Sequence, residues 1–265
     1  MMRRLIRGQP VQSKPTPNGY QMCPTTLLRP KSGTQPPLLL PVPTRYKAPT
    51  PDGWTRTMPD QDLPQLYLIT PPVLDLEMFP QRLAACLDAT EIGCVRLSLA
   101  SRDEDHIARV ADALREVTHA RDVAIVIDTH MLLVERLGLD GVHLTDGARS
   151  VRKMRKDLGA DAIIGASCGT SRHDGMTAGD LGADYVSFGP VGLSPLGTGD
   201  QADLALFQWW SDMIEVPCVA EGALDLDLIR ALTPHTDFFG LGDEIWGQDD
   251  PARALLILRA AMDQA

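Results

Sequence analysis

The chain has 265 residues, enough for one large domain or two small ones, and its 44% hydrophobic content is typical of a globular protein with a sizeable core. A formal net charge of −10 argues against a nucleic-acid-binding protein, which needs a basic surface. No run approaches the ~18 apolar residues needed to cross a bilayer, so no membrane span is predicted. The five cysteines form no CxxC pair, which excludes a zinc ribbon and favours a cytoplasmic location.

The charge is unevenly distributed along the chain. Residues 1–57 contain nine Lys or Arg and one acidic residue, Asp52, so this segment carries +8 and the remainder carries −10 − 8 = −18. Eleven of the 21 prolines also lie there. Such a segment cannot bury enough apolar surface to offset its chain entropy, and we expect it to be disordered. Its basic start is typical of a transit peptide. The alternative is that translation begins at Met58, and that residues 1–57 are a mis-assigned extension of a domain at 58–265.

From Leu66 onward, short apolar runs alternate with amphipathic segments. The eight runs that we interpret as strands are 66–70, 94–99, 123–127, 141–144, 162–165, 184–188, 216–220 and 237–241. Between the second and third runs, apolar residues recur at helical spacing in 107–117. Ser101 and Glu104 have the spacing of a capping box before this helix. Asp250 followed by Pro251 predicts the start of the last helix.

Eight strand–helix units in about 200 residues give about 25 residues per unit. A chain of that length matches the lower size limit of a (β/α)8 TIM barrel. A doubly wound sheet would show a glycine-rich loop after the first strand, and this chain has Pro71-Pro72 there. We therefore predict a single (β/α)8 barrel. Function in such a barrel is expected where the strands end and the following loops begin.

The predicted strand ends are rich in carboxylates and poor in ammonium groups. Four of them carry an acidic residue: Asp128, Asp146, Glu221 and Asp243. The only lysines after residue 57 are Lys153 and Lys156, on a predicted helix at 151–158 that should lie outside the barrel. The sequence thus predicts an anionic rim.

Several segments carry a family resemblance. They are Leu-Tyr-Leu-Ile-Thr at 66–70, Gly-Val-His-Leu at 141–144, Gly-Ala-Asp-Tyr-Val-Ser-Phe-Gly-Pro-Val at 182–191 and Val-Pro-Cys-Val-Ala-Glu-Gly at 216–222. In this order and spacing they resemble the thiamine phosphate synthase family, which also contains the related thiazole tautomerase. The resemblance covers about residues 66–263.

The resemblance implies a (β/α)8 barrel acting in thiamine biosynthesis. The family reaction joins an aminopyrimidine diphosphate to a thiazole phosphate and releases pyrophosphate with the help of Mg²⁺. It implies a small heterocyclic substrate as the partner and leaves the oligomeric state open. The matching positions implied as catalytic are Arg96, Ser98 and Ser167. Those implied as substrate-binding are Thr170, Gly189, Ser194, Thr198, Glu221, Gly222, Gly242 and Asp243. Those nearest the metal-ligand positions are Asp128 and Asp146.

This chain departs from the family pattern where the diphosphate would bind. After the second strand the family has Gln-Leu-Arg and, two residues on, Lys, whereas residues 96–100 read Arg-Leu-Ser-Leu-Ala. The family's lysine after the sixth strand is absent from residues 192–198. A diphosphate leaving group needs cations because negative charge develops on it as the bond breaks. We therefore expect reduced or altered activity.

The metal and tautomerase positions also differ. Asp128 stands one residue before the family's metal-binding aspartate, and Asp146 stands two residues early. Because strand side chains alternate between faces, a shift of one residue changes where a side chain points. The family's Ser-Thr-His-Thr turn after the fifth strand reads Ser-Cys-Gly-Thr at 167–170, so the histidine needed by a tautomerase is missing.

Three functional hypotheses follow. The first is a divergent synthase in which Arg96 and Arg172 replace the lost lysines, while Asp128 and Asp146 hold Mg²⁺. The second is a non-catalytic relative that binds an unphosphorylated or cationic ligand, such as an aminopyrimidine or thiamine. The third is a thiazole tautomerase-like enzyme, weakened by Gly169.

Simpler structural roles compete with these hypotheses. A buried arginine needs a carboxylate partner, so Arg96 is expected to pair with Asp128 or Glu221 inside the barrel. His143 is expected to be a hydrogen-bonded residue of the barrel interior.

Overall fold

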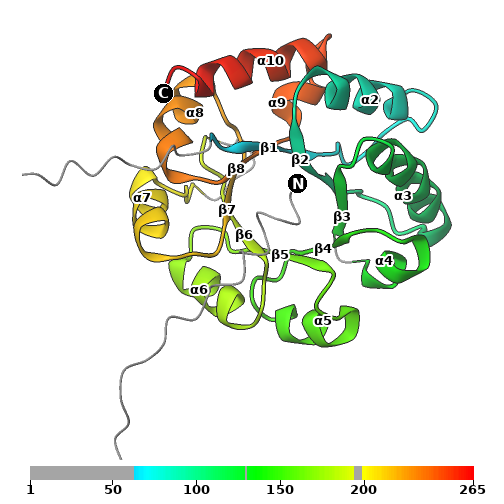
Figure 1. Ribbon diagram of the computed structural model, residues 1–265, viewed down its shortest axis with the longest axis horizontal. Coiled ribbons are helices and arrows are strands. Elements are labelled where there is room, and N and C mark those ends of the chain that lie inside the picture. The colour runs from blue at the N-terminus through cyan, green and yellow to red at the C-terminus, as the bar shows by residue number, and fades with distance from the viewer. Residues whose placement is uncertain (1–62, 129, 194–198) are drawn as a thin grey trace, which may run out of the picture. The chain divides into compact units, whose positions relative to one another are not determined.

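Eight short apolar strands pair side by side in parallel and close on themselves in the order β1 to β8 (Figure 1). The computed structural model describes residues 63–128, 130–193 and 199–265. The strands are β1 (Gln65–Ile69), β2 (Ile92–Leu97), β3 (Ala124–Asp128), β4 (Gly141–Leu144), β5 (Ile163–Ser167), β6 (Tyr185–Phe188), β7 (Cys218–Glu221) and β8 (Phe238–Leu241). Since β1 pairs with both β2 and β8, the sheet has no edge. The predicted TIM barrel is confirmed, and the predicted boundary near residue 58 lies outside the described residues.

A ring of helices surrounds the strands (Figure 1). The helices are α2 (Phe79–Ala89), α3 (Glu104–His119), α4 (Met131–Leu137), α5 (Val151–Leu158), α6 (Arg172–Asp180), α7 (Leu204–Met213), α8 (Leu226–Leu232), the 3₁₀ helix η1 (Thr233–His235), α9 (Asp243–Trp246) and α10 (Pro251–Met262). No helix of the described residues is long and apolar enough to cross a membrane.

Side-chain caps set the start of several helices, and one predicted cap is wrong. The residue that caps α3 is Asp103, whose Oδ1 accepts from the N–H groups of Asp105 at 3.1 Å and His106 at 3.2 Å. Ser101 lies too early and instead accepts from the N–H of Asp103 at 3.2 Å. The predicted start of α10 is confirmed, because Asp250 accepts from the N–H of Arg253 at 3.0 Å.

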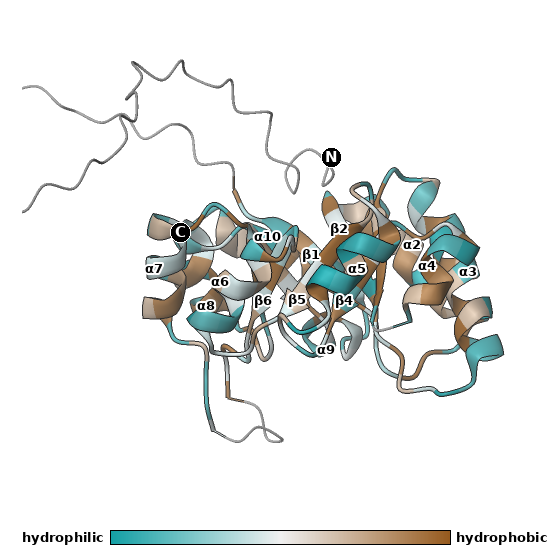
Figure 2. Cartoon of the chain, turned by 90° about the horizontal axis from the view of Figure 1, so that it is seen from below, coloured by the Kyte–Doolittle hydropathy of each residue, from teal (hydrophilic) through white to brown (hydrophobic). Residues whose placement is uncertain are grey.

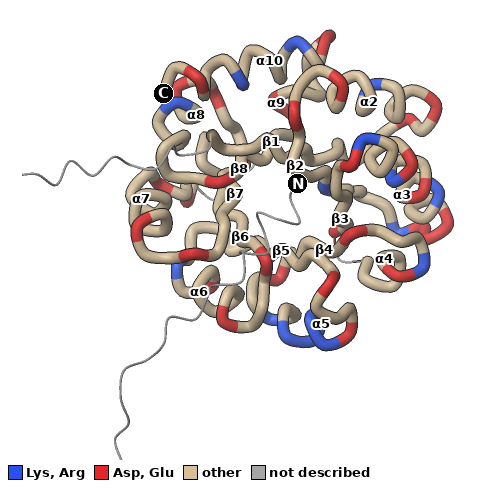
Figure 3. The backbone as a smooth tube through the Cα atoms, in the orientation of Figure 1, with Lys and Arg blue, Asp and Glu red and all other residues tan. Residues whose placement is uncertain are grey.

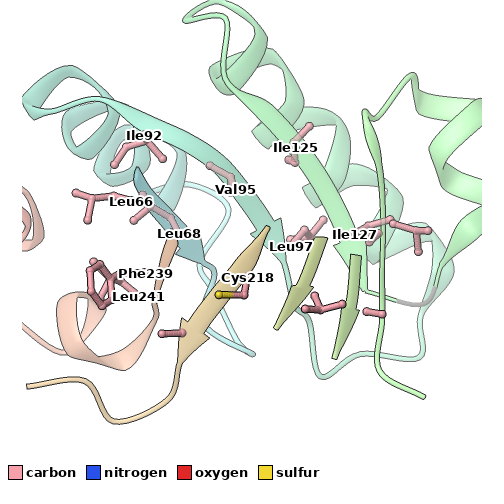
Figure 4. Packing of buried hydrophobic residues seen from close by; sticks show 14 of the residues in the cluster. Leu66, Leu68, Ile92, Val95, Leu97, Ile125, Ile127, Cys218, Phe239 and Leu241 are labelled. Atoms are coloured by element: carbon pink, nitrogen blue, oxygen red, sulfur yellow. The ribbon is translucent and has the colours of Figure 1, made fainter. Parts of the chain in front are cut away.

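Alternation along the strands separates two hydrophobic clusters. Leu66 and Leu68 on β1 point outward and pack in the large cluster between strands and helices (Figure 4). Tyr67, between them, points into the barrel interior. The interior cluster consists of Tyr67, Cys94, Val126, Ile163, Tyr185, Val219 and Phe238. Figure 2 shows the resulting pattern, with hydrophobic strands inside and hydrophilic outer faces on helices such as α5.

Tyr185 needs a glycine opposite it in the barrel interior. Gly165 on β5 pairs in register with Tyr185 on β6. A Cβ atom at position 165 would lie 2.1 Å from Cζ of Tyr185, far inside van der Waals contact. Gly165 therefore makes room for the tyrosine ring.

We predict that Gly165→Ala destabilises the fold by about 1–3 kcal/mol, because the added methyl group overpacks a closed interior. Urea denaturation measures the loss. Replacing the ring by Tyr185→Leu should reduce the cost of Gly165→Ala in the double variant. The same cost with and without the ring would show that the contact does not constrain position 165.

Candidate active site

Arg96 lies at the centre of a charged cluster inside the barrel, near the carboxyl ends of the strands, which we call the mouth. Its Nη1 donates to Glu221 Oε2 at 2.8 Å and to His143 Nε2 at 3.0 Å, and its Nε lies 3.5 Å from Asp128 Oδ1. The side chains of Arg96, Asp128 and Glu221 are only 12%, 17% and 16% exposed. The expected pairing of Arg96 is confirmed with both carboxylates. We call Arg96, Asp128, His143 and Glu221 the Arg96 cluster.

The charges of this cluster do not cancel. Arg96 contributes +1 while Asp128 and Glu221 contribute −1 each when ionised, which leaves −1. Burial, the largest single influence, lowers the pKa of Arg96, but the Glu221 and Asp128 carboxylates and the two buried tyrosines together outweigh it, and the pKa is raised. Burial raises the pKa of Asp128, although the Arg96 charge and a hydrogen bond from Ser98 oppose the shift. Arg96 is therefore always charged and already neutralised by the protein.

The ring of His143 connects the cluster to two tyrosines. A guanidinium can only donate hydrogen bonds, so Nε2 of His143 must accept from Arg96. The ring hydrogen is then on Nδ1, which donates to the Tyr185 hydroxyl at 3.0 Å. The Tyr185 hydroxyl in turn lies 2.7 Å from that of Tyr67. Burial and the nearby Arg96 charge both lower the pKa of His143, so the ring is neutral, and its predicted interior position is confirmed.

Both carboxylate oxygens of Glu221 are engaged. Oε2 accepts from Arg96, and Oε1 accepts from the Ser187 hydroxyl at 3.0 Å. Ser167, a candidate catalytic residue, ends β5 and pairs in register with Ser187. Sequence reasoning missed Tyr185 and Ser187 as parts of the site. The strand pattern could have indicated them, because alternate residues of one strand face the same side and Tyr185 and Ser187 are two residues apart on β6.

The two candidate metal ligands do not come together. Asp128 lies in the interior beside the Arg96 guanidinium, whereas Asp146 is exposed on the loop after β4 and accepts from the Ser150 hydroxyl at 2.6 Å. No group of three or more His, Cys, Asp or Glu side chains among the described residues is placed to hold a metal ion. Mg²⁺ takes oxygen ligands in near-octahedral geometry, and a neighbouring guanidinium repels it. Asp128 and Asp146 therefore do not fit a magnesium site.

The glycine turns at the mouth have their N–H groups partly committed. The N–H of Gly189 donates to the Gly169 carbonyl at 3.1 Å, and that of Gly242 donates to Glu244 Oε2 at 2.7 Å. The Gly222 carbonyl accepts from Gly192 at 3.0 Å, which ties the loops after β6 and β7 together. Gly189 and Gly242 thus do not present free N–H groups to a phosphate.

The remaining candidates lie around the rim. The backbone N–H of Ser98, just after β2, donates to Thr70 Oγ1 at 3.0 Å. Thr170 is exposed just before α6, and Asp243 is exposed at the start of α9. Ser194 and Thr198 lie outside the described residues.

Arg172 does not join the Arg96 cluster. Its guanidinium donates to the Ala205 carbonyl at 2.8 Å and lies 4.9 Å from the Trp209 ring centroid. Arg172 therefore faces α7, which contradicts the hypothesis that Arg96 and Arg172 jointly replace the lost lysines. Figure 3 shows basic residues gathered on α5, outside the ring of strands. Lys153 and Lys156, the two lysines among the described residues, lie on this helix.

A cavity of about 530 Å³ lies away from these residues. Its lining includes Gln65 at the start of β1, Phe238 at the start of β8, and Trp210 of α7. These positions are at the amino ends of the strands, opposite the mouth. The cavity is therefore not the candidate active site, because the chemistry of a (β/α)8 barrel is built at the carboxyl ends.

Comparisons with known proteins agree on one family. The sequence profile of the family described as thiamine monophosphate synthase matches residues 66–236. The thiamine-phosphate synthase of Rhodospirillum centenum is 40% identical over 196 residues, which are 72% of this chain and 94% of that protein. The enzyme of the same name from Erythrobacter litoralis is 37% identical over 203 residues, covering 74% and 94% of the two chains.

Solved structures support the fold. Thiamine phosphate pyrophosphorylase from Pyrococcus furiosus superposes with a TM-score of 0.65 at 21% identity, covering 76% of this chain and 96% of that one. A 3-hexulose-6-phosphate synthase superposes with a TM-score of 0.58 at 17% identity, covering 74% and 99%. At such identities the likeness concerns the barrel alone.

The neutral state of His143 predicts how stability depends on pH. The folded-state pKa lies below the unfolded value of 6.5, so the unfolded chain binds the extra proton as the pH falls. The contribution of neutral His143 to the free energy of unfolding is fully present above pH ~6.5. Below that pH the free energy of unfolding falls by at most about 1.4 kcal/mol per pH unit.

His143→Gln is the matched control, because an amide can accept from Arg96 and donate to Tyr185 without titrating. Urea denaturation at several pH values between 5 and 8 should show a steeper loss of stability for the wild type than for His143→Gln. Shifts at Asp128 and other carboxyls are shared by both proteins and cancel. Parallel profiles would mean that His143 titrates normally.

Proposed function

The chain belongs to the thiamine monophosphate synthase family, and we propose on this basis that it joins an aminopyrimidine diphosphate to a thiazole phosphate, slowly compared with typical members. The relatives named thiamine-phosphate synthase align along nearly their whole length, which supports the same reaction class. The low rate follows from the contacts of the Arg96 cluster.

This proposal depends on one observation: the Arg96 guanidinium already donates to Glu221 and His143. The leaving pyrophosphate gains negative charge in the transition state and needs positive groups around it. Arg96 is held by Glu221 and His143 in the interior, so its charge is not available to a diphosphate. Among the described residues, the lysines lie on α5, outside the barrel.

The residues of the mouth suit the heterocycle better than the phosphates. Each Glu221 oxygen already accepts one hydrogen bond and can accept a second, Asp128 adds another carboxylate, and Ser167 places a hydroxyl group beside the Ser187 position. Such groups can orient an amino-substituted ring and exclude water from it. We propose that they position the aminopyrimidine, while binding of its diphosphate is weak.

A second candidate function is binding of an unphosphorylated or cationic ligand without coupling. When Asp128 and Glu221 are both ionised, the net charge of −1 in the Arg96 cluster favours this function, since two like charges ~4 Å apart repel by about 4 kcal/mol at an effective dielectric constant near 20. A thiazole tautomerase-like reaction is less well supported. Gly169 stands where the histidine would be needed, and both ring nitrogens of His143 are hydrogen-bonded.

We predict measurable but slow release of pyrophosphate when the full chain is given both phosphorylated substrates and Mg²⁺. The Rhodospirillum centenum relative, assayed in parallel, is the reference. We expect this chain to be slower by about 10²–10³, the usual cost of losing one group that stabilises transition-state charge. A protein beginning at Met58 should behave like the full chain. Release as fast as in the reference would contradict the role given to Arg96, and no release would contradict the proposed reaction.

The second function predicts a different ligand preference. In a thermal-shift titration, thiamine and the free aminopyrimidine should stabilise the chain more than pyrophosphate with Mg²⁺ does, because only bound ligands raise the unfolding temperature. Stabilisation by pyrophosphate alone would reject binding of a cationic heterocycle.

A further inference from the structure

His143 is an unusual partner for a buried arginine because it carries no charge. The side chain of Arg96 is long enough to turn toward an anion at the mouth, yet one atom, Nη1, is shared between Glu221 Oε2 at 2.8 Å and His143 Nε2 at 3.0 Å. Glu221 supplies the attraction. What His143 supplies is direction, because a ring nitrogen accepts a hydrogen bond along one line in the plane of the ring.

The orientation of the His143 ring is fixed by Tyr185, which lies deeper in the barrel interior. Its Nδ1–H donates to the Tyr185 hydroxyl at 3.0 Å, and the two rings stack with centroids 5.7 Å apart and planes inclined by 27°. Tyr185 is fully buried, with Gly165 opposite its ring and the Tyr67 hydroxyl 2.7 Å away. We call Tyr67, Tyr185 and His143 the ladder. Both tyrosines are fully buried, so they have no direct role in binding a ligand.

We propose that His143 is a positioning residue that keeps the Arg96 guanidinium on Glu221, so that it does not turn toward a phosphate anion at the mouth and the site discriminates against such anions. This inference rests on the proposed function only in placing the ligand at the mouth. The tyrosines hold the His143 ring in place, and Arg96, which can only donate, makes Nε2 the acceptor. Were the ladder broken, Arg96 would lose one of its two close partners and could turn toward an anion.

Two substitutions at position 143 separate this role from simple packing. Glutamine keeps both hydrogen bonds, since its amide oxygen can accept from Arg96 and its amide nitrogen can donate to Tyr185. Leucine fills a similar volume but offers no acceptor. Both variants have the same charge as neutral His143, so a difference between them comes from the hydrogen bonds that link Arg96, position 143 and Tyr185.

The test is calorimetric titration of pyrophosphate, at a fixed Mg²⁺ concentration, into the full chain. We expect His143→Leu to bind pyrophosphate roughly tenfold more tightly than the wild type, because a released guanidinium can approach the anion. His143→Gln should match the wild type. Loss of packing alone would weaken binding or leave it unchanged, so a gain in affinity is specific to the proposal.

Tyr185→Phe is the second variant, for use if His143→Leu does not fold. It removes the hydroxyl that fixes the His143 ring, and it should shift pyrophosphate affinity in the same direction. Equal or weaker binding by these variants relative to His143→Gln, including no binding by any of them, overturns the proposal. Because no coupling step is measured, the result is independent of whether the chain forms thiamine phosphate.

Discussion

The ion pairs of Arg96 are the interaction on which the site depends. A guanidinium in the interior of a barrel is strongly destabilising unless carboxylates neutralise it, and removing one partner of such a pair costs about 3–5 kcal/mol. Glu221 at 2.8 Å and Asp128 at 3.5 Å meet this requirement. The same contacts make the charge of Arg96 unavailable to a substrate. Stability and the proposed ligand preference therefore depend on the same side chain.

The closed sheet explains why these residues meet. Arg96, Asp128 and Glu221 come from β2, β3 and β7, and only a barrel brings three such strands around one interior. Tyr67 and Tyr185 fill the barrel interior next to these charged side chains. Gly165 is needed because Tyr185 reaches across to β5. The polar layer at the mouth thus rests on an aromatic layer, which positions the His143 ring, while Arg96 sets its tautomer.

The sequence predicted the barrel because apolar runs and amphipathic segments repeat eight times, and it placed Asp128 and Glu221 at strand ends and Arg96 inside the barrel. It could not distinguish Asp128 from Asp146. Both follow apolar runs, but Asp128 is the last residue of β3 while Asp146 lies beyond the end of β4, where alternation no longer fixes direction. Arg172 looked equivalent to Arg96 for a similar reason, and its contact with Trp209 depends on helix packing. The hydrogen bonds of His143 depend on ring orientation, which no spacing rule gives.

The hydrogen bond from Arg96 to a neutral His143 ring is tested most directly by the nitrogen-15 NMR spectrum of that ring between pH 5 and 8. If Arg96 is held as described, Nδ1 carries the hydrogen, Nε2 has the shift of an unprotonated acceptor, and neither signal changes across the range. A ring that becomes protonated near pH 6.5, or that carries its hydrogen on Nε2, would contradict the account, because such a ring cannot accept a hydrogen bond from Arg96.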